Sequence, residues 1–346
     1  MMTDLIKEQE YYSRPLLHSY SSLTRLLYSP QLYYKYYILK EREETLQPSL
    51  VEGKVIHCLL LDNGTFNDQF VISPGKLPEG NNKLVCDQIF KVLRDNNQLG
   101  LSLQECNKEI LTILKEIDLH QSLTDDKKAD PAGVKRTGDE KRIDKILTEQ
   151  NISYFEYLKS KGNRIIVDQE TFEKCSEAVS VIRDHQEIAA MLGLESFSND
   201  DSLIVFNEKE LRMETHPVYP FGLKGVLDNY AIDHTRKIIR INDLKTTGKS
   251  LHEFRDSLEY FRYDIQAVIQ KLLVTMNNLD LIKAGYQIIF TFVVIDKYQQ
   301  LYPFEVSAST MMEWENKFEE VLKAASWHYQ EKRYELPYEF SKKVTL

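Results

Sequence analysis

Residues 222–270 read GLKGVLDNYAIDHTRKIIRINDLKTTGKSLHEFRDSLEYFRYDIQAVIQ and contain two apolar runs that each end in a carboxylate. Asp228 ends the first run, and Asp243 ends the second, with Lys245 two positions further on. An extended chain points alternate side chains to opposite faces, so Asp243 and Lys245 share one face while Leu244 points into the core. The pattern therefore predicts a pair of strands with polar groups gathered where the strands end.

The sequence around this region predicts the other strands and helices of a mixed sheet. Strand patterns lie at 202–207, 210–216, 221–233, 237–247, 284–296 and 301–306. Helical patterns lie at 51–62, 262–278 and 309–333. We expect the first two strands to form one hairpin and the next two to form a second. Counted from the helix at 51–62, the order of these segments contains αβββαβ, so the predicted fold class is α+β (mixed α/β), a central mixed sheet flanked by helices.

The remaining segments are mainly helical in pattern. Residues 14–40 predict two helices, the first capped at Ser21-Ser22 and the second beginning after the break at Ser29-Pro30. We expect one domain over 1–346, with its catalytic sheet and helices at 202–333. Residues 82–200 predict a helical insertion, and the polar, breaker-rich segment 122–142 predicts an exposed charged loop within it.

Composition limits the class of protein. The chain has 346 residues, of which 42% are hydrophobic and 28% charged, as in ordinary globular domains. No apolar run approaches the roughly 20 residues that span a bilayer, and the N-terminus lacks an apolar signal core. We therefore expect a cytoplasmic protein that does not contact membranes. The formal net charge of -9 argues against binding nucleic acid through overall charge, although a local basic channel is compatible with it.

The cysteines do not form a metal-binding pattern. The four cysteines have no CxxC spacing, so free thiols are expected rather than disulfides or a structural zinc.

The acids and the lysine of the central region have the chemistry of a cation site. Asp228 and Asp243 can each bind an oxygen-seeking cation, and Mg²⁺ accepts few protein ligands while it keeps several waters. Lys245 is a point charge suited to lowering the pKa of an attacking water or to stabilising a pentavalent phosphate. Each residue alone is more simply a polar strand end that faces water. The combination favours a site suited to phosphodiester hydrolysis.

His57 is a fourth candidate, on the helix at 51–62. A single histidine on an apolar helical face is more often a core residue than a ligand. Gly53 lies one turn earlier, and a glycine within a helix costs about 1 kcal/mol relative to alanine, so it marks close packing or close approach of a ligand. An imidazole here could bind a metal or contact a phosphate.

Several motifs occur in an order that resembles a known superfamily. They are S-S-L-T-R-L-L-Y-S-P-x-x-Y (Ser21–Tyr33), G-x-x-x-H (Gly53–His57), L-K-G-V-L-D (Leu223–Asp228), D-L-K-T-T (Asp243–Thr247) and Y-F-R-Y-D-I-Q (Tyr260–Gln266). Together they resemble the PD-(D/E)XK nuclease superfamily, and within it the RecE (exodeoxyribonuclease VIII) and RecB-like branch. Each motif is loose by itself, and their order makes the resemblance specific. Residues 82–200 match nothing in it.

The resemblance implies a restriction-endonuclease-like αβββαβ core and Mg²⁺-dependent cleavage of DNA, with Mn²⁺ able to substitute. It implies that His57, Asp228 and Asp243 are metal ligands and that Lys245 is the catalytic lysine. Gln266 would be the glutamine of the QxxxY motif, which helps to place the DNA end and the lysine.

Three positions are open or depart from the family pattern. The family often has an acid on the first strand, for which the candidates are Glu208, Glu210 and Glu214. Gln270 stands where the QxxxY motif has tyrosine. Ser29 stands where some relatives have cysteine, and no cysteine follows Cys175, so we predict no iron–sulfur cluster.

By resemblance, the expected activity is exonucleolytic hydrolysis at the ends of double-stranded DNA, with 5′ to 3′ resection for recombination or repair. The resemblance also implies a single-strand annealing protein as partner, a homo-oligomeric ring and a phage or prophage setting. Two alternatives stay open. One is a structure-specific or single-strand nuclease, since residues 82–200 could build a different channel, and the other is a non-catalytic DNA-binding scaffold that keeps the fold.

Overall fold

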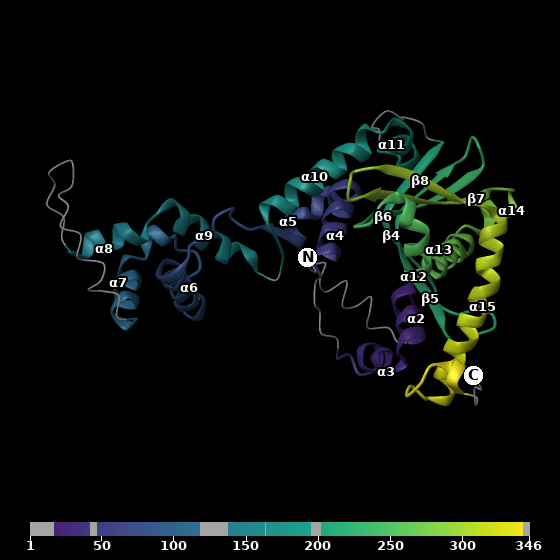
Figure 1. Ribbon diagram of the computed structural model, residues 1–346, viewed down its shortest axis with the longest axis horizontal. Helices are drawn as coiled ribbons and strands as arrows, with labels where there is room; N and C mark the ends of the chain where they lie inside the picture. Colours follow the sequence, from purple (N-terminus) through teal and green to yellow (C-terminus); the bar gives the residue numbers. More distant parts are fainter. Residues whose placement is uncertain (1–16, 42–46, 118–137, 163, 195–201, 342–346) are drawn as a thin grey trace. The chain divides into compact units, whose positions relative to one another are not determined.

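The computed structural model describes residues 17–41, 47–117, 138–162, 164–194 and 202–341. The chain forms two compact units (Figure 1). One unit combines Met1–Phe66 with Cys175–Leu346 and contains the main sheet, and the other is Asn67–Lys174.

The first unit is built on a six-stranded mixed sheet. Its strands are β1 (Leu17–His18), β4 (Leu203–Met213), β5 (Gly222–Asp233), β6 (Ile238–Thr247), β7 (Gln287–Asp296) and β8 (Leu301–Val306). The pairs β4–β5, β5–β6 and β7–β8 are antiparallel, and β6–β7 and β1–β5 are parallel. The predicted hairpin of β5 and β6 is confirmed, and so is the mixed character of the sheet.

One edge of β5 is divided between two partner strands. Strand β4 pairs with β5 along one edge, from residue 223 to residue 233. On the opposite edge, β1 pairs with Gly222 and Leu223, and β6 pairs with residues 229–233. No described strand pairs with residues 224–228 on that edge, so the sheet opens there. Gly222 permits the crowded start of β5, because an added Cβ would lie 2.2 Å from the carbonyl oxygen of Met213.

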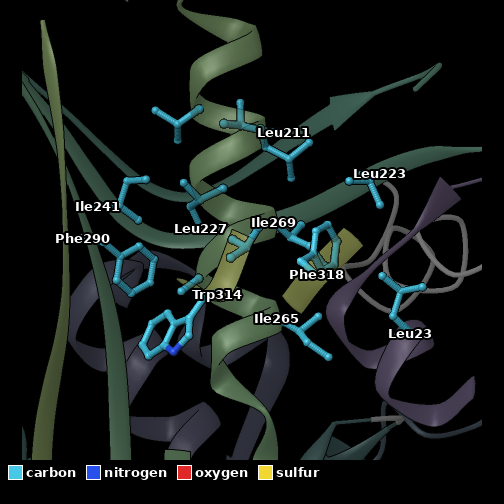
Figure 2. Close-up of a cluster of buried hydrophobic side chains, with 14 of the residues drawn as sticks. Leu23, Leu211, Leu223, Leu227, Ile241, Ile265, Ile269, Phe290, Trp314 and Phe318 are labelled. Atoms are coloured by element: carbon cyan, nitrogen blue, oxygen red, sulfur yellow. The ribbon is translucent and has the colours of Figure 1, made fainter. Parts of the chain in front are cut away.

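Three helices bury one face of the sheet. They are α2 (Tyr20–Tyr28), α13 (Tyr263–Asn277) and α15 (Ala308–Glu331). Figure 2 shows their side chains with those of the sheet in one core, including Leu23, Leu227, Ile265, Ile269, Phe290 and Phe318. Each of these six is no more than 3% exposed, so this face is a closed core and a rigid base for the strand ends.

Other helices cover the opposite face. They are α4 (Pro48–Leu61) and α11 (Gln186–Leu192), while α10 (Gln169–Asp184) contacts α4 through hydrogen bonds from Cys175 and Arg183 to the carbonyls of Glu52 and Leu59. Ile241 points into the core, so its neighbour Asn242 points to the other face, where its amide donates to the carbonyl of Met191 at 3.2 Å. Asn229 donates likewise to Leu192 at 2.9 Å, and these bonds satisfy carbonyls at the end of α11. Helices therefore flank both faces, as predicted.

The remaining helices of this unit are short or lie at its edges. They are α3 (Pro30–Tyr33), α12 (Phe254–Phe261) and α14 (Leu279–Lys283). Along the chain, α4, β4, β5, β6, α13 and β7 follow in this order, with further helices and the strands β2 and β3 between α4 and β4, α12 between β6 and α13, and α14 between α13 and β7. The assignment of this order to the restriction-endonuclease-like core stays a prediction.

The second unit, Asn67–Lys174, is mainly helical. Its helices are α6 (Gly80–Asp95), α7 (Asn107–Glu116), α8 (Gly138–Ile146) and α9 (Glu149–Lys161), and α5 (Phe66–Gln69) begins at its boundary. They enclose a separate apolar core that includes Ile89, Leu114 and Phe155. Strands β2 (Phe70–Ile72) and β3 (Ile165–Val167) pair in parallel. Strand β3 was not predicted, because its three residues lie inside a region whose periodicity is helical.

The predicted insertion at 82–200 and the predicted single domain over 1–346 stay predictions, and the insertion's bounds differ from those of the compact unit. Of the predicted charged loop at 122–142, residues 122–137 lie outside the described residues, and residues 138–142 begin α8.

Two local predictions are wrong. The segments 202–207 and 210–216 do not form a hairpin, because 203–213 is the single strand β4 and pairs with β5 throughout. The polar residues at 207–209 resemble a turn, but Glu208 adopts a φ of 45° and kinks the strand without reversing it. The cap of α2 is Ser19, not Ser21, because Ser19 accepts from the N–H of Ser22, whose hydroxyl accepts from the N–H of Ser19 in return.

Two other expectations can be compared with the structure. All four cysteines are free thiols, as predicted. Among the described residues, no helix combines the length and the apolarity needed to cross a bilayer.

Candidate functional site

The site lies where β5 and β6 separate. Their last opposed pair is Asn229 with Asn242, and Asp228 and Asp243 would form the next pair if the ladder continued. Instead, the N–H of Leu244 donates to Asp228 Oδ2 at 2.8 Å, and its carbonyl oxygen lies 3.1 Å from Nε2 of His57. The peptide groups of Leu244 therefore bond to side chains in place of a neighbouring strand.

Three side chains gather at this opening, and we call them the cation cluster: His57, Glu208 and Asp228. Nδ1 of His57 lies 3.5 Å from Oε1 of Glu208 and 3.6 Å from Oδ1 of Asp228. One ligand atom from each residue lies within 4.8 Å of the others. Glu208 stands opposite Asp228 because β4 pairs residue 207 with 229 and residue 209 with 227.

Helix α4 places the imidazole close to β6. An added Cβ at Gly53 would lie 3.4 Å from Oγ1 of Thr246, an ordinary van der Waals contact, so α4 lies against β6 at this glycine. Because a carbonyl oxygen only accepts, the contact with Leu244 requires the proton of the neutral imidazole to be on Nε2 of His57. Its Nδ1 then faces the two carboxylates with a free lone pair.

The two acids favour a positive charge between them. Burial by itself favours the neutral imidazole, but the charges of Asp228 and Glu208 outweigh it and raise the pKa of His57 to about 9. Burial also raises the pKa of Asp228, against the opposing effect of His57 and Lys245. The cluster therefore attracts either a proton on His57 or an added cation.

A second group, the lysine network, consists of Asp243, Lys245, Gln266 and Gln270. Nζ of Lys245 lies 2.6 Å from Oδ2 of Asp243 and donates to Oε1 of Gln266 at 2.9 Å. Oδ1 of Asp243 accepts from the amides of Gln266 at 2.7 Å and Gln270 at 3.0 Å. Gln266 therefore bridges the acid and the lysine, and both oxygens of Asp243 have partners.

The lysine network is largely buried, and its lysine keeps its positive charge. Asp243 is 0% exposed, and burial raises its pKa. Burial alone would lower the pKa of Lys245, but the charges of Asp243 and Asp228 outweigh it and raise that pKa. The ring of Tyr263, whose centroid is 4.5 Å from Nζ, adds a further favourable contact. Lys245 is therefore an ammonium at neutral pH.

The structure brings the predicted residues to one place but in two groups. His57 and Asp228 are joined by Glu208, while Lys245, Asp243 and Gln266 form the adjoining network. The roles assigned to these residues, including that of Asp243 as a metal ligand, stay predictions.

Of the three candidate glutamates, Glu208 is the one that lies beside His57 and Asp228. Glu208 faces the site, Glu210 is paired with Arg212, and Glu214 follows the end of β4. Sequence reasoning left this choice open because it depends on the pairing of β4 with β5, and this segment was predicted to be a hairpin instead.

Gln270 is a site residue that the sequence interpretation treated only as a departure from the family pattern. It is 2% exposed and donates to Asp243 from one turn beyond Gln266 on α13. The spacing of four residues, which places both amides on one helical face, was the available signal.

The donor set of the cation cluster has the composition of a divalent metal site. Two carboxylates supply the hard oxygen ligands that Mg²⁺ and Mn²⁺ prefer, and Nδ1 of His57 supplies a nitrogen. The bonds from Leu244 hold Asp228 and His57 through their other atoms, as the supporting partners of metal ligands do. The residues present therefore fit such an ion.

Comparison with known proteins adds little. No family model matches the chain, and no curated protein matches it. A crystal structure of a protein from Eubacterium rectale, described provisionally as an exonuclease, is similar with a TM-score of 0.42 and 11% identity, over 89% of this chain and 81% of that chain. A similarity this remote assigns neither fold nor activity to this chain.

Proposed function

We propose that this protein is a divalent-cation-dependent DNA nuclease whose centre is formed by the cation cluster and the lysine network. The observation that carries the proposal is the position of Leu244. Its peptide groups bond to Asp228 and His57, and its chain neighbours are Asp243 and Lys245. Two carboxylates, an imidazole and a lysine ammonium are thereby held at one opening of the sheet.

The residues divide the chemistry between them. Mg²⁺ or Mn²⁺ held by His57, Glu208 and Asp228 would polarise a phosphate and lower the pKa of a nearby water. Lys245 presents a positive charge that can stabilise the negative charge developing on phosphoryl oxygens. Gln266 accepts from Lys245 and donates to Asp243, so it holds the ammonium in one orientation.

The finer proposal concerns the substrate. We infer exonucleolytic action at the ends of double-stranded DNA, with 5′ to 3′ polarity and a single-strand annealing protein as partner. Its support is the order of the motifs that resemble the RecE and RecB-like branch, rather than the geometry of the site.

A nuclease assay with defined DNA forms tests both the proposed nuclease activity and the proposed action at the ends of double-stranded DNA. Linear duplex, closed circular duplex and single-stranded DNA are incubated with purified protein and Mg²⁺, Mn²⁺ or EDTA. We expect degradation of the linear duplex with either ion, none with EDTA, and intact closed circles. Lys323→Ala, which changes an exposed lysine paired with Glu320 on α15, is the matched control for Lys245→Ala.

Two outcomes would contradict the proposal at different levels. Cleavage of closed circles contradicts an obligate exonuclease and favours a structure-specific enzyme. Protein that hydrolyses no DNA form with either ion contradicts the nuclease itself and favours a binding scaffold.

A further inference from the structure

Two aromatic rings at the end of α12 are exposed beside the candidate site. Tyr260 is 70% exposed and Phe261 is 47% exposed, and their ring centroids lie 4.9 Å apart. The ring of Phe261 stacks on that of Tyr263 at 5.6 Å, and Nζ of Lys245 lies 4.5 Å from the centroid of Tyr263. We call Tyr260, Phe261 and Tyr263 the aromatic platform. It forms a continuous series of ring contacts from the protein surface to the lysine.

The backbone under the exposed rings is held in place by α2. The hydroxyl of Tyr28 donates to the carbonyl of Tyr260 at 2.7 Å, and the hydroxyl of Tyr20 donates to the carbonyl of Phe261 at 2.6 Å. These carbonyls end α12, where Arg262 closes the helix in the left-handed region with a φ of 57°. The rings are therefore exposed on a fixed frame, not on a loose loop.

Such an arrangement is suited to stacking on a flat ligand. Preorganised aromatic rings lose little conformational entropy on binding, and every nucleobase has a face on which an aromatic ring can stack. The chain has a formal net charge of -9, so overall charge does not attract DNA, and stacking would supply contact that electrostatics does not.

We propose that the aromatic platform stacks on an unpaired nucleobase of the DNA, next to the phosphate presented to Lys245. This inference rests on the proposed nuclease function and specifies its substrate class. The base faces of an intact duplex are covered by neighbouring pairs, so the platform selects DNA with a frayed or single-stranded end.

A fluorescence titration tests this assignment. The probe is a duplex with a single-stranded extension that carries 2-aminopurine, whose fluorescence is quenched by stacking, with Ca²⁺ in place of Mg²⁺ to slow hydrolysis. We expect the wild-type protein to quench the probe on binding. Tyr260→Ala and Phe261→Ala should each weaken binding about 10- to 100-fold and abolish the quenching.

Matched variants separate stacking from folding. Tyr260→Phe keeps the ring and should bind and quench like the wild-type protein. Phe340→Ala removes another exposed ring, 52% exposed near the end of the described chain, and should change neither binding nor quenching. Thermal unfolding of all four variants shows whether a loss of binding reflects a loss of structure.

The possible results separate this inference from the nuclease proposal. Wild-type hydrolysis of DNA with unchanged binding by both alanine variants overturns the platform alone. Platform-dependent quenching without hydrolysis by the wild-type protein overturns the nuclease alone. Absence of DNA binding overturns both. A wild-type dimer that Tyr260→Ala dissociates, with DNA binding unchanged, shows a self-association surface and also overturns the platform.

Discussion

The cation cluster and the lysine network adjoin at Leu244, yet they satisfy their charges in different ways. In the cluster, the contacts of His57 with the two carboxylates are 3.5 and 3.6 Å long. In the network, Oδ1 of Asp243 accepts hydrogen bonds from two amides at 2.7 and 3.0 Å, and Oδ2 forms an ion pair with Nζ of Lys245 at 2.6 Å. The cluster has two acids and one imidazole, whereas the network pairs one acid with one permanent cation.

This difference separates a binding function from a positioning function. Buried charges are stable only when partners compensate them, and the network contains its own compensation. The cluster reaches the same condition with a proton on His57 or with an external cation, and the proposed hydrolysis requires the external cation. We therefore expect changes in the cluster to affect cation affinity, and changes in the network to affect stability and turnover.

The largest expected effect is on turnover, from Lys245→Met. Loss of the ammonium removes the charge proposed to stabilise the transition state, so kcat on linear duplex DNA should fall by about 10²- to 10³-fold. Affinity for Mn²⁺, measured by calorimetry, should stay within about tenfold of wild type, because the cluster retains all its ligand atoms. Lys323→Met is the control, and a Lys245→Met variant with nearly normal turnover would contradict the role of this residue.

The next largest effects should come from two substitutions that each neutralise one carboxylate, one in the cation cluster and one in the lysine network. Glu208→Gln should weaken Mn²⁺ binding at least about tenfold, because it removes a ligand. It should change the free energy of unfolding by less than about 1 kcal/mol, because the Glu208 side chain is 35% exposed. Asp243→Asn should lower the free energy of unfolding by about 3–5 kcal/mol, because it leaves the buried Lys245 without its anion. Urea unfolding measures the free energy of unfolding of both variants, and calorimetry measures their affinity for Mn²⁺. Equal changes in both quantities for the two variants would contradict the proposed difference between the cluster and the network.

A smaller effect should separate the two glutamines. Gln266→Leu and Gln270→Leu each remove a hydrogen bond to a buried carboxylate, so each should lower the free energy of unfolding by about 1.5–3 kcal/mol. Only Gln266 also contacts Lys245, so turnover should fall further in Gln266→Leu than in Gln270→Leu. Equal turnover in the two variants would mean that the bridge to the lysine has no functional role.

A buried histidine away from the cluster provides the pH comparison. His18 is 3% exposed, and burial, with a smaller effect from the charge of Lys224, lowers its pKa from 6.5 to about 4. His57 is only partly buried, and its two carboxylates raise its pKa to about 9. The pKa of a histidine thus shifts downward or upward according to the groups around its imidazole.

For His18 the folded pKa is the lower one, so its contribution to stability is complete above pH 6.5 and is lost as pH falls toward 4. Between about pH 7.5 and about pH 5, the wild-type protein should lose about 2 kcal/mol of unfolding free energy that His18→Gln does not lose. Urea unfolding at the two pH values measures this, and parallel losses in both proteins would refute the assignment. The contribution of His57 has the opposite sign, since it is present below about pH 6.5 and is lost as pH rises through about 9.

Local patterns predicted most of the fold. The alternation of β5 and β6, the helical period of α13 and α15, and the polar strand ends are properties of short segments, and the strands and helices predicted from these patterns are present. The fold of the sequence around Glu208 was not predictable in this way. A kink and a turn have the same polar composition, and only pairing with β5 distinguishes them.

The residues of the site were predictable only in part, and their division into two groups was not. Asp228, Asp243, Lys245 and His57 stand out by residue type and spacing, whereas the positions of Glu208 and Gln270 depend on how β4 and α13 pack. That Leu244 divides them into two groups depends on where the pairing of β5 with β6 ends, which is a tertiary property. The aromatic platform could not be predicted from the sequence either, because the exposure of Tyr260 depends on how α2 packs against α12.

The central claim is that His57, Glu208 and Asp228 bind a divalent cation beside Lys245. Anomalous diffraction from crystals soaked in Mn²⁺ tests it directly, because the manganese signal locates the ion without reference to activity. The account predicts a peak about 2.0–2.4 Å from Nδ1 of His57 and from one carboxylate oxygen each of Glu208 and Asp228. A peak elsewhere with this cluster empty, or no peak at saturating Mn²⁺, would contradict it.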